Sequence, residues 1–400
     1  MFRLVRLWAT IHPRLSPEAI RWRMSRSGRH GSHVVIGSEE KCLYPGLSCL
    51  FQNQDQWRSL TLFLSEERSR DDLLAEMQVG MRNVYLPNLY CLDATFDEPT
   101  LNIFGNPSAS LSLFTNWSMP NLRTLRLLNM LPTHTSTTSL IHCSISLDSR
   151  FALRSRDFFV NLSPIHRFLV ASTSLETLEL AFSSIKDGIF QRPPREPIHL
   201  PLLRKFLFHL AIRDCNNLDE LSRCKIQIEL AEMVHAPNLE ELDLFFMDLS
   251  SLGLYCVFDR LTRRNGDCKN LHSLTVEVKG SDDGVDVLGC IFNNLPQIKT
   301  LTVKGTMVTT WSAVLHPVSL RTIVLKSISD TDGLLLKRIW GLLQLITGPV
   351  WSNQFPDFDK IVVQDCNFFH ETSRRVSQVS LRQAQELLRC LEASDKVILG

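Results

Sequence analysis

A short leucine phrase recurs along this 400-residue chain and limits the folds that the chain can adopt. In the phrase, a proline or a small polar residue precedes the pattern LxxLxL. The clearest copies are MPNLRTLRL at 119–127, STSLETLEL at 172–180 and APNLEELDL at 236–244. Weaker copies occur at 86–94, 200–208, 268–276, 295–303 and 316–325, and degraded ones at 57–62 and 355–363. So many copies identify an internal repeat.

The spacing of the copies indicates the kind of repeat. The first core position of successive copies falls at 89, 122, 175, 203, 239, 271, 298 and 320. The longest interval, between 122 and 175, contains the alternating stretch Leu140–Leu147 (LIHCSISL), which we interpret as a further strand. With it, the intervals approach or slightly exceed the roughly 20–29 residues of leucine-rich repeats.

The chemistry of the phrase predicts a strand in each copy. The last two leucines alternate with period two, so they face one side of a short strand, and the proline suits the strand's start. Helix-like stretches lie between copies, at 158–170, 225–235, 254–263 and 285–293. We therefore predict the α/β class: an irregular leucine-rich-repeat solenoid, or horseshoe, with parallel strands on the concave face and helices on the convex face. An ordinary doubly wound α/β domain is the alternative, but it would not repeat this strand entry at eight or more places.

The two ends differ from the array. Residues 1–55 are predicted to be a basic helical segment that leads into the first strand, with seven arginines among the first 33 residues. That run is an RNA- or membrane-contacting arm or, our preferred reading, a helical cap with solvated arginines and buried apolar residues such as Ile20 and Trp22. The array is assigned to residues 56–400. Its last part, 380–400, is a helical cap that opens with the capping box Ser380–Gln383 and ends in a strand at 396–399.

The sequence offers few groups for catalysis or metal binding. No phosphate-binding, dinucleotide-binding, nucleophile-elbow or zinc-protease motif occurs, so we expect no enzyme activity, no catalytic residue, no cofactor and no metal. Cys366 and His370 lack a second pair at zinc-finger spacing, and His142 and Cys143 point to opposite faces of a strand.

Composition bears on the compartment and on the partners. The net charge is +1, which provides no field for nucleic acid or an anionic membrane. Eleven irregularly spaced cysteines indicate reduced thiols and an intracellular protein, in cytoplasm or nucleus. The apolar stretch 333–346 is interrupted by Lys337 and Arg338, so we interpret it as a buried amphipathic helix rather than a membrane span.

The remaining candidate site is the concave face. Residues between the core leucines project from it, and their mixed, mostly uncharged character suits a protein partner better than a polyanion. The alternative is that threonine is simply a good exposed strand residue. The candidate partner-binding residues are Thr124, Arg126, Thr177, Glu179, Lys205, Glu241, Asp243, Ser273, Thr275, Thr300, Thr302 and Thr322.

The phrases resemble the leucine-rich regions of fungal F-box proteins, especially the basidiomycete type. LVRLWATI at 4–11 looks like the end of an F-box, and AIRWRMSRSGRHGSHVVI at 19–36 is similar to that family's transition into its first strand. The resemblance implies that the repeats select substrates for an SCF-type ubiquitin ligase. The adaptor-binding part of the F-box would lie before Met1, so an adaptor partner is expected only if such a segment exists upstream. The alternative is a leucine-rich-repeat scaffold without a ubiquitin role.

Overall fold

A computed structural model places the chain in the α/β class, with parallel strands and few helices. The structure describes residues 10–28, 31–38, 46–64, 84–96, 117–132, 139–148, 160–161, 163–185, 190–191, 196–212, 233–247, 269–279, 287–305, 317–328, 335–349, 352–366, 386, 389–390 and 394–399. The chain divides into two compact units. Unit 1 comprises Met1–Leu203 with Met233–Ala236, and unit 2 comprises Arg204–Glu232 with Pro237–Gly400.

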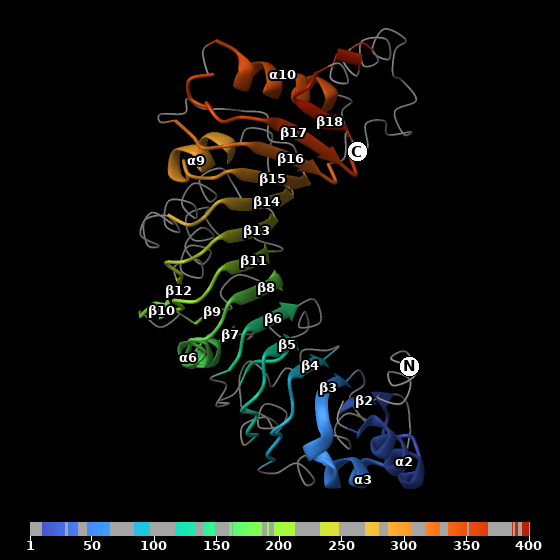
Figure 1. Cartoon of the computed structure of the whole chain (residues 1–400). Coiled ribbons are helices and arrows are strands. Elements are labelled where there is room, and N and C mark those ends of the chain that lie inside the picture. The colour runs from blue at the N-terminus through green and yellow to red at the C-terminus, as the bar shows by residue number, and fades with distance from the viewer. Residues whose placement is uncertain are drawn as a thin grey trace. The chain divides into compact units, whose positions relative to one another are not determined.

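Unit 1 is built on seven parallel strands in the order β1-β2-β3-β4-β5-β6-β8 (Figure 1). These strands are β1 (Thr10–Ile11), β2 (Ser32–Ser38), β3 (Trp57–Leu64), β4 (Cys91–Phe96), β5 (Thr124–Leu128), β6 (His142–Asp148) and β8 (Thr177–Ile185). The helices are α2 (Pro17–Ser27), α3 (Leu47–Gln52), the 3₁₀ turn η2 (Gln54–Gln56) and α6 (Ser163–Ala171). Two short parallel pairs complete the unit: β7 (Val160–Asn161) with β9 (Phe190–Gln191), and β10 (Ile198–His199) with β12 (Val234–His235).

Unit 2 also has seven parallel strands, in the order β11-β13-β14-β15-β16-β17-β18. They are β11 (Lys205–Ile212), β13 (Glu241–Met247), β14 (Ser273–Lys279), β15 (Thr300–Gly305), β16 (Thr322–Lys326), β17 (Lys360–Gln364) and β18 (Val397–Leu399). Helix α9 (Val287–Asn294) precedes β15, and helix α10 (Leu335–Thr347) precedes β17. A helix before a parallel strand provides the crossover that parallel pairing requires.

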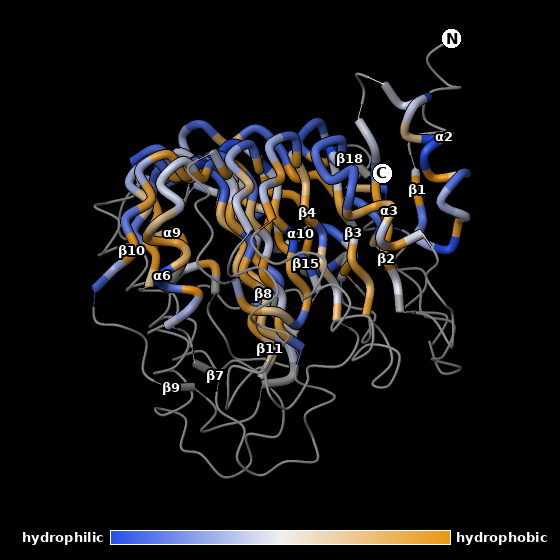
Figure 2. Tube along the Cα trace, turned by 90° about the horizontal axis from the view of Figure 1, so that it is seen from below, coloured by the Kyte–Doolittle hydropathy of each residue, from blue (hydrophilic) through white to orange (hydrophobic). Residues whose placement is uncertain are grey.

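The leucine phrase forms the core in the way that its alternation predicts. In β13, Leu242, Leu244 and Phe246 are buried, whereas Glu241 and Asp243 face the other side of the sheet. The hydrophobic residues of strands and helices and the hydrophilic turns can be followed along the chain in Figure 2. Each fully buried leucine side chain contributes about 1.5–3 kcal/mol, so stacked strands supply stability that no single repeat could provide.

The asparagine of the Pro-Asn-Leu entry joins successive repeats. In unit 1, the side-chain amide of Asn88 donates to the carbonyl oxygen of Asp55 across 2.7 Å, and that of Asn121 donates to Pro87 across 2.7 Å. In unit 2, Asn270 donates to the Oδ1 atom of Asn238 across 3.3 Å. The phrase therefore encodes a polar link between neighbouring turns as well as a buried strand.

Strand exits share a left-handed backbone conformation. Gly305, Ser327 and Asp365 each lie five positions after the first residue of their strand, with φ of 80°, 53° and 53°. Asn129 occupies the same position after β5, with φ 57°, and it is buried. A left-handed residue is uncommon outside glycine, asparagine and aspartate, so this position is a repeated structural requirement.

Several sequence predictions are confirmed. Leu140–Leu147 overlaps β6, and the degraded copies at 57–62 and 355–363 overlap β3 and β17. Residues 285–293 and 333–346 overlap α9 and α10, and Ile339 and Ile346 of α10 are buried. No helix in the described part of the chain is long and apolar enough to cross a membrane. His142 and Cys143 lie on opposite faces of β6, one exposed and one buried.

Other predictions need correction. The helix expected at 225–235 is wrong at its last two residues, where Val234–His235 forms strand β12, while residues 225–232 lie outside the described ranges. The helix expected at 158–170 begins at Ser163, after the strand β7. Trp22 is 46% exposed and lies under the Arg26 guanidinium instead of being buried. Strands β1 and β2 already join the sheet before residue 56, within the segment predicted to be helical. The stretch 254–263 and the capping box at 380–383 lie outside the described residues.

Candidate protein-binding surface

All twelve candidate residues lie on strands and project from the face opposite the buried leucines, where each is exposed or half-buried. We call this accessible side the polar face of each unit. Strand pairing aligns its side chains in rows that cross the strands, because the parallel pairs are in register. Neighbouring strands are about 4.8 Å apart, so adjacent members of a row are direct neighbours.

Unit 2 brings eight of the candidates together on five neighbouring strands. Its first row contains the candidates Lys205, Glu241, Ser273, Thr300 and Thr322. Its second row contains Asp243, Thr275 and Thr302, with Leu207 before them and Val324 after them. The central part of this surface is therefore a block of hydroxyl side chains on β14, β15 and β16.

Charged side chains border that block, and they form two ion pairs with one another. Lys205 Nζ lies 2.8 Å from Glu241 Oε2 on the adjacent strand. Lys304 Nζ lies 3.8 Å from Asp243 Oδ2, so this pair spans β14 between β13 and β15. Both pairs are solvent-accessible, and such pairs contribute little to stability. Their positions allow them to exchange partners with charges on a bound protein.

Unit 1 contains four of the candidates, which are separated by residues of β6. Thr124 and Thr177 share a row with His142 between them, and Arg126 and Glu179 share a row with Ser144 between them. Asp93 precedes Arg126 in the second row. The row thus runs acid, base, hydroxyl and acid across four neighbouring strands.

Sequence reasoning missed several members of the polar face in unit 1. The first row includes His33, Ser59 and Cys91, and the second row includes Thr61 and Asp93. The signal was present in the period-two alternation of 32–38 and 57–64, but those strands lack the full leucine phrase. The described ladder therefore extends the candidate surface beyond the residues selected from clear repeats.

Burial changes the proton affinity of three groups in unit 1. Desolvation lowers the pKa of His33, assisted by nearby His12 and opposed by Asp93, and its Nδ1 atom is hydrogen-bonded to Ser59 Oγ. Desolvation raises the pKa of the Cys91 thiol, which Arg126 partly opposes. Complete burial raises the pKa of Cys143 far above its ordinary value, and repulsion from Glu179 adds to the effect. Neither thiol has the lowered pKa of an activated nucleophile.

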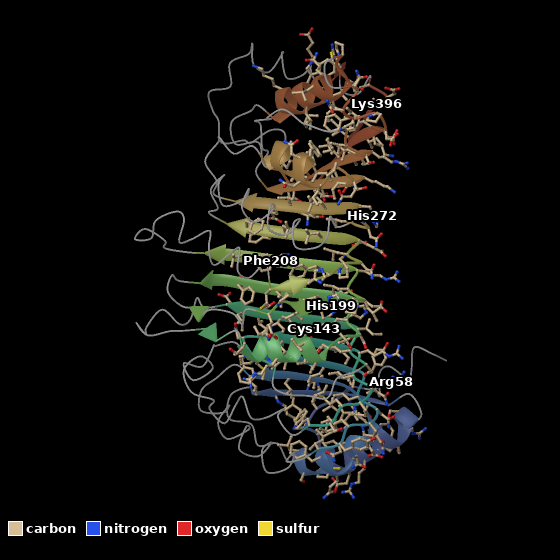
Figure 3. All side chains as sticks on the ribbon, turned by 90° about the vertical axis from the view of Figure 1, so that its left-hand side faces the viewer. Arg58, Cys143, His199, Phe208, His272 and Lys396 are labelled. Carbon is tan, nitrogen blue, oxygen red and sulfur yellow. The ribbon has the colours of Figure 1, made fainter. Side chains whose placement is uncertain are left out.

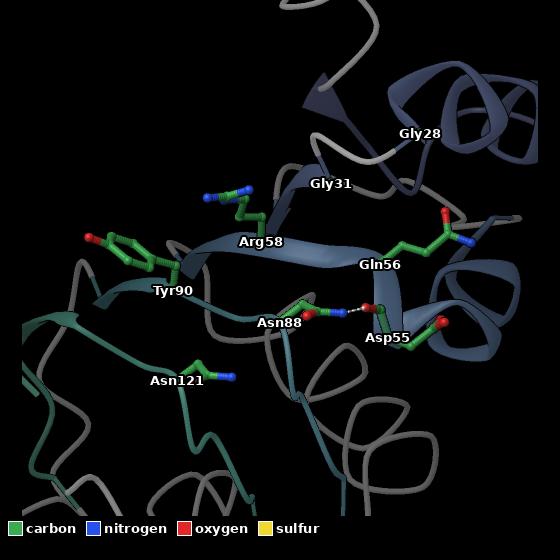
Figure 4. Close-up of a pocket in the computed structure, with 8 residues that line it drawn as sticks. All are labelled: Gly28, Gly31, Asp55, Gln56, Arg58, Asn88, Tyr90 and Asn121. Atoms are coloured by element: carbon green, nitrogen blue, oxygen red, sulfur yellow. Dashed lines mark hydrogen bonds between the residues drawn. The ribbon is translucent and has the colours of Figure 1, made fainter. Parts of the chain in front are cut away.

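A groove of about 400 Å³ lies beside the strand entries of unit 1. Gly28, Gly31, Asp55, Gln56, Arg58, Asn88, Tyr90 and Asn121 line it (Figure 4). Arg123 stacks over Tyr90 with its guanidinium carbon 5.4 Å from the ring centroid. Figure 3 shows that Arg58 and, in unit 2, His272 lie where the strands of their own units begin. The groove thus extends the accessible surface of unit 1 from the polar face to the entry turns.

The described ranges contain no group of three or more His, Cys, Asp or Glu side chains placed to hold a metal ion. Cys366 donates from Sγ to the carbonyl oxygens of Leu325 and Gln364, while His370 lies outside those ranges. Searches of protein-family models and of characterised proteins find no match to this sequence. The chemistry of the accessible surface is therefore the main basis for a function.

Proposed function

We propose that this chain is a non-catalytic protein-binding module that contacts its partner through the polar face. The observation that carries the proposal is the in-register block of hydroxyl side chains on β14, β15 and β16, with ion pairs beside it. Such a surface offers hydrogen bonds and methyl contacts across several strands without a concentrated charge. A protein surface with mixed polar and apolar groups fits these properties better than a polyanion does.

The finer fold that we propose is an irregular leucine-rich-repeat solenoid. Support comes from the repeated phrase, from the parallel strands of each unit and from the asparagine links between turns. In a repeat protein of this kind, accessible strand positions form an extended binding surface. We assign Thr124, Arg126, Thr177 and Glu179 in unit 1, with the eight candidates of unit 2, to that surface.

We further propose that the bound protein is a substrate of an SCF-type ubiquitin ligase, on the basis of the resemblance at 4–11 and 19–36. The alternative is a scaffold of the same fold that binds its partner without a ubiquitin role. Both use the polar face, and they differ in whether a ligase adaptor joins the complex. Co-purification of the chain with the adaptor subunit, with and without the upstream coding sequence, separates them. Failure of both forms to retain the adaptor favours the scaffold.

Site-specific photocrosslinking tests the binding role itself. A benzophenone amino acid replaces Thr302 in the centre of the polar face or, as a control, the exposed Lys337 on α10. We expect a discrete protein adduct from position 302 inside cells and none from position 337. A second probe at Ser273, in the first row of the adjacent strand, should give the same adduct. Equal adducts from all three positions, or none from 302 and 273, would contradict the proposal.

A further inference from the structure

Two histidines occupy the same place in successive repeats of the leucine phrase. His199 stands in IHLPLL and His235 in VHAPNL, each two residues before the proline of its phrase. The histidines are 36 residues apart, which is also the spacing of the first core leucines Leu203 and Leu239. The repeat therefore aligns the two imidazoles, and β10 and β12 pair them directly, His199 with His235.

The local backbone holds both rings on one side of this short parallel pair. Ile198 and Val234 are buried, so the next residue of each strand projects the other way. The Leu200 N–H donates to the carbonyl oxygen of His235 across 2.9 Å, and the Ile198 N–H donates to that of Met233 across 2.8 Å. His199 is exposed and His235 is half-buried.

The side chains meet through their Nδ1 atoms, which are 2.7 Å apart. The rings are stacked, with centroids 4.9 Å apart and planes inclined by 25°. At this distance one Nδ1 carries a proton and donates it, while the other presents its lone pair. If the donor ring moves its proton to Nε2, both Nδ1 lone pairs become available with no change in total charge.

We propose that His199 and His235 form a two-histidine site for a tetragonal divalent ion, Cu²⁺ or Ni²⁺. Metal–imidazole distances are about 2.0–2.1 Å, so two ligands at a right angle have nitrogens about 2.9 Å apart. A tetrahedral site needs about 3.3 Å between them. The 2.7 Å between the nitrogens is a hydrogen-bond distance, so each ring must turn to aim its lone pair at the ion. The right-angle arrangement needs the smaller separation of the two nitrogens, and it is typical of Cu²⁺ and Ni²⁺ rather than structural Zn²⁺.

The surroundings define what kind of metal site this is. His166 on the adjacent helix α6 is buried, and its Nε2 donates to the carbonyl oxygen of Glu196 across 2.8 Å, so that nitrogen is not a third ligand. Among the described residues, no third His, Cys, Asp or Glu side chain is placed to join the two imidazoles. The site therefore binds an exchangeable ion. The bound ion would link the segment Met233–Ala236 to the rest of unit 1.

Serine substitutions provide the test, because Ser118 occupies the equivalent position in an earlier repeat, also on a parallel bridge. The full chain is titrated with Ni²⁺ by calorimetry as wild type, H199S, H235S, the double variant and H272S. His272 is half-buried and its Nδ1 is hydrogen-bonded to the carbonyl oxygen of Asn270, so it controls for a single accessible histidine. We expect one saturable site in the wild type and H272S, at least tenfold weaker binding in each single variant, and no such site in the double variant.

Two further measurements check that the variants are folded and that the ligands are imidazole nitrogens. Circular dichroism without metal should be the same for all five proteins. Electron paramagnetic resonance with Cu²⁺, after alkylation of accessible thiols, should show two equatorial nitrogens in the wild type and lose that signal in H199S and H235S. The proposal is overturned if the wild type has no saturable site, or if folded H199S and H235S bind as H272S does. These results are independent of the protein-binding function.

Discussion

The side-chain amide of Asn129 donates to the carbonyl oxygen of Phe96 across 2.8 Å, which joins the exits of β5 and β4. Its Oδ1 atom also accepts from the Asp148 N–H at 2.7 Å, at the end of β6. One buried asparagine thus satisfies backbone groups of both neighbouring strands, and its backbone adopts φ 57°. This residue is a structural link across three repeats of unit 1.

Replacement of Asn129 by alanine should lower the free energy of unfolding by about 3–5 kcal/mol. The substitution removes the side-chain partners of the Phe96 carbonyl and the Asp148 N–H. It also leaves the left-handed backbone to alanine, whose side chain forms no local hydrogen bond to offset the strain. Urea unfolding followed by circular dichroism measures the loss. Asn129→Gly is the matched control: it loses the same two side-chain hydrogen bonds but suits the left-handed backbone, so it should lose less than alanine does. Equal stability of Asn129→Ala and the wild type would contradict this role.

At the strand exits of unit 2, a change to glycine should raise the stability of the fold and a change to alanine should lower it. Ser327 has φ 53°, so Ser327→Gly should stabilise the fold by up to about 1 kcal/mol. Gly305 has φ 80° at the same position of the preceding repeat, so Gly305→Ala should destabilise it by about 1–2 kcal/mol. Thermal unfolding of both variants provides the measurement. A change of the same sign in both would show that backbone conformation does not dominate here.

The lowered pKa of His33 predicts an acid-dependent loss of stability. The unfolded state binds a proton near pH 6.5, whereas the folded state resists it, since burial penalises the charged ring. The stabilising difference is therefore complete above about pH 6.5 and is lost as the pH falls from there through the folded-state pKa. Unfolding free energies between pH 8 and pH 5 should fall more steeply for the wild type than for His33→Gln. Parallel curves for the two proteins would refute the prediction.

The thiol of Cys143 should be inert while the protein is folded. Burial raises its pKa, so almost no thiolate exists near neutral pH, and no reagent reaches the side chain. Cys390 is exposed. Alkylation followed by peptide mass spectrometry should label Cys390 faster than Cys143 by about two orders of magnitude or more. In denaturant the two rates should converge, and comparable rates in the native protein would contradict the burial of Cys143.

The polar face was predictable residue by residue wherever the leucine phrase was clear. Period two places Thr300 and Thr302 opposite Leu301, and the structure has them so. Prediction was weaker where the leucine phrase is incomplete. In β2 and β3 apolar and polar residues alternate without the full pattern, so His33, Ser59 and Thr61 were missed. The helix predicted over 225–235 was wrong at its end because Val234–His235 pairs with β10, a contact made 36 residues away.

The amino-acid sequence by itself determined the repeat, the buried leucines and the direction in which each strand side chain points, because these follow from a period of two along one segment. Only the tertiary structure decided which side chains become neighbours. The link from Asn129 to Phe96 and the meeting of His199 with His235 depend on the register between segments more than 30 residues apart. That register is set by packing and by hydrogen bonds between repeats, which no single segment contains.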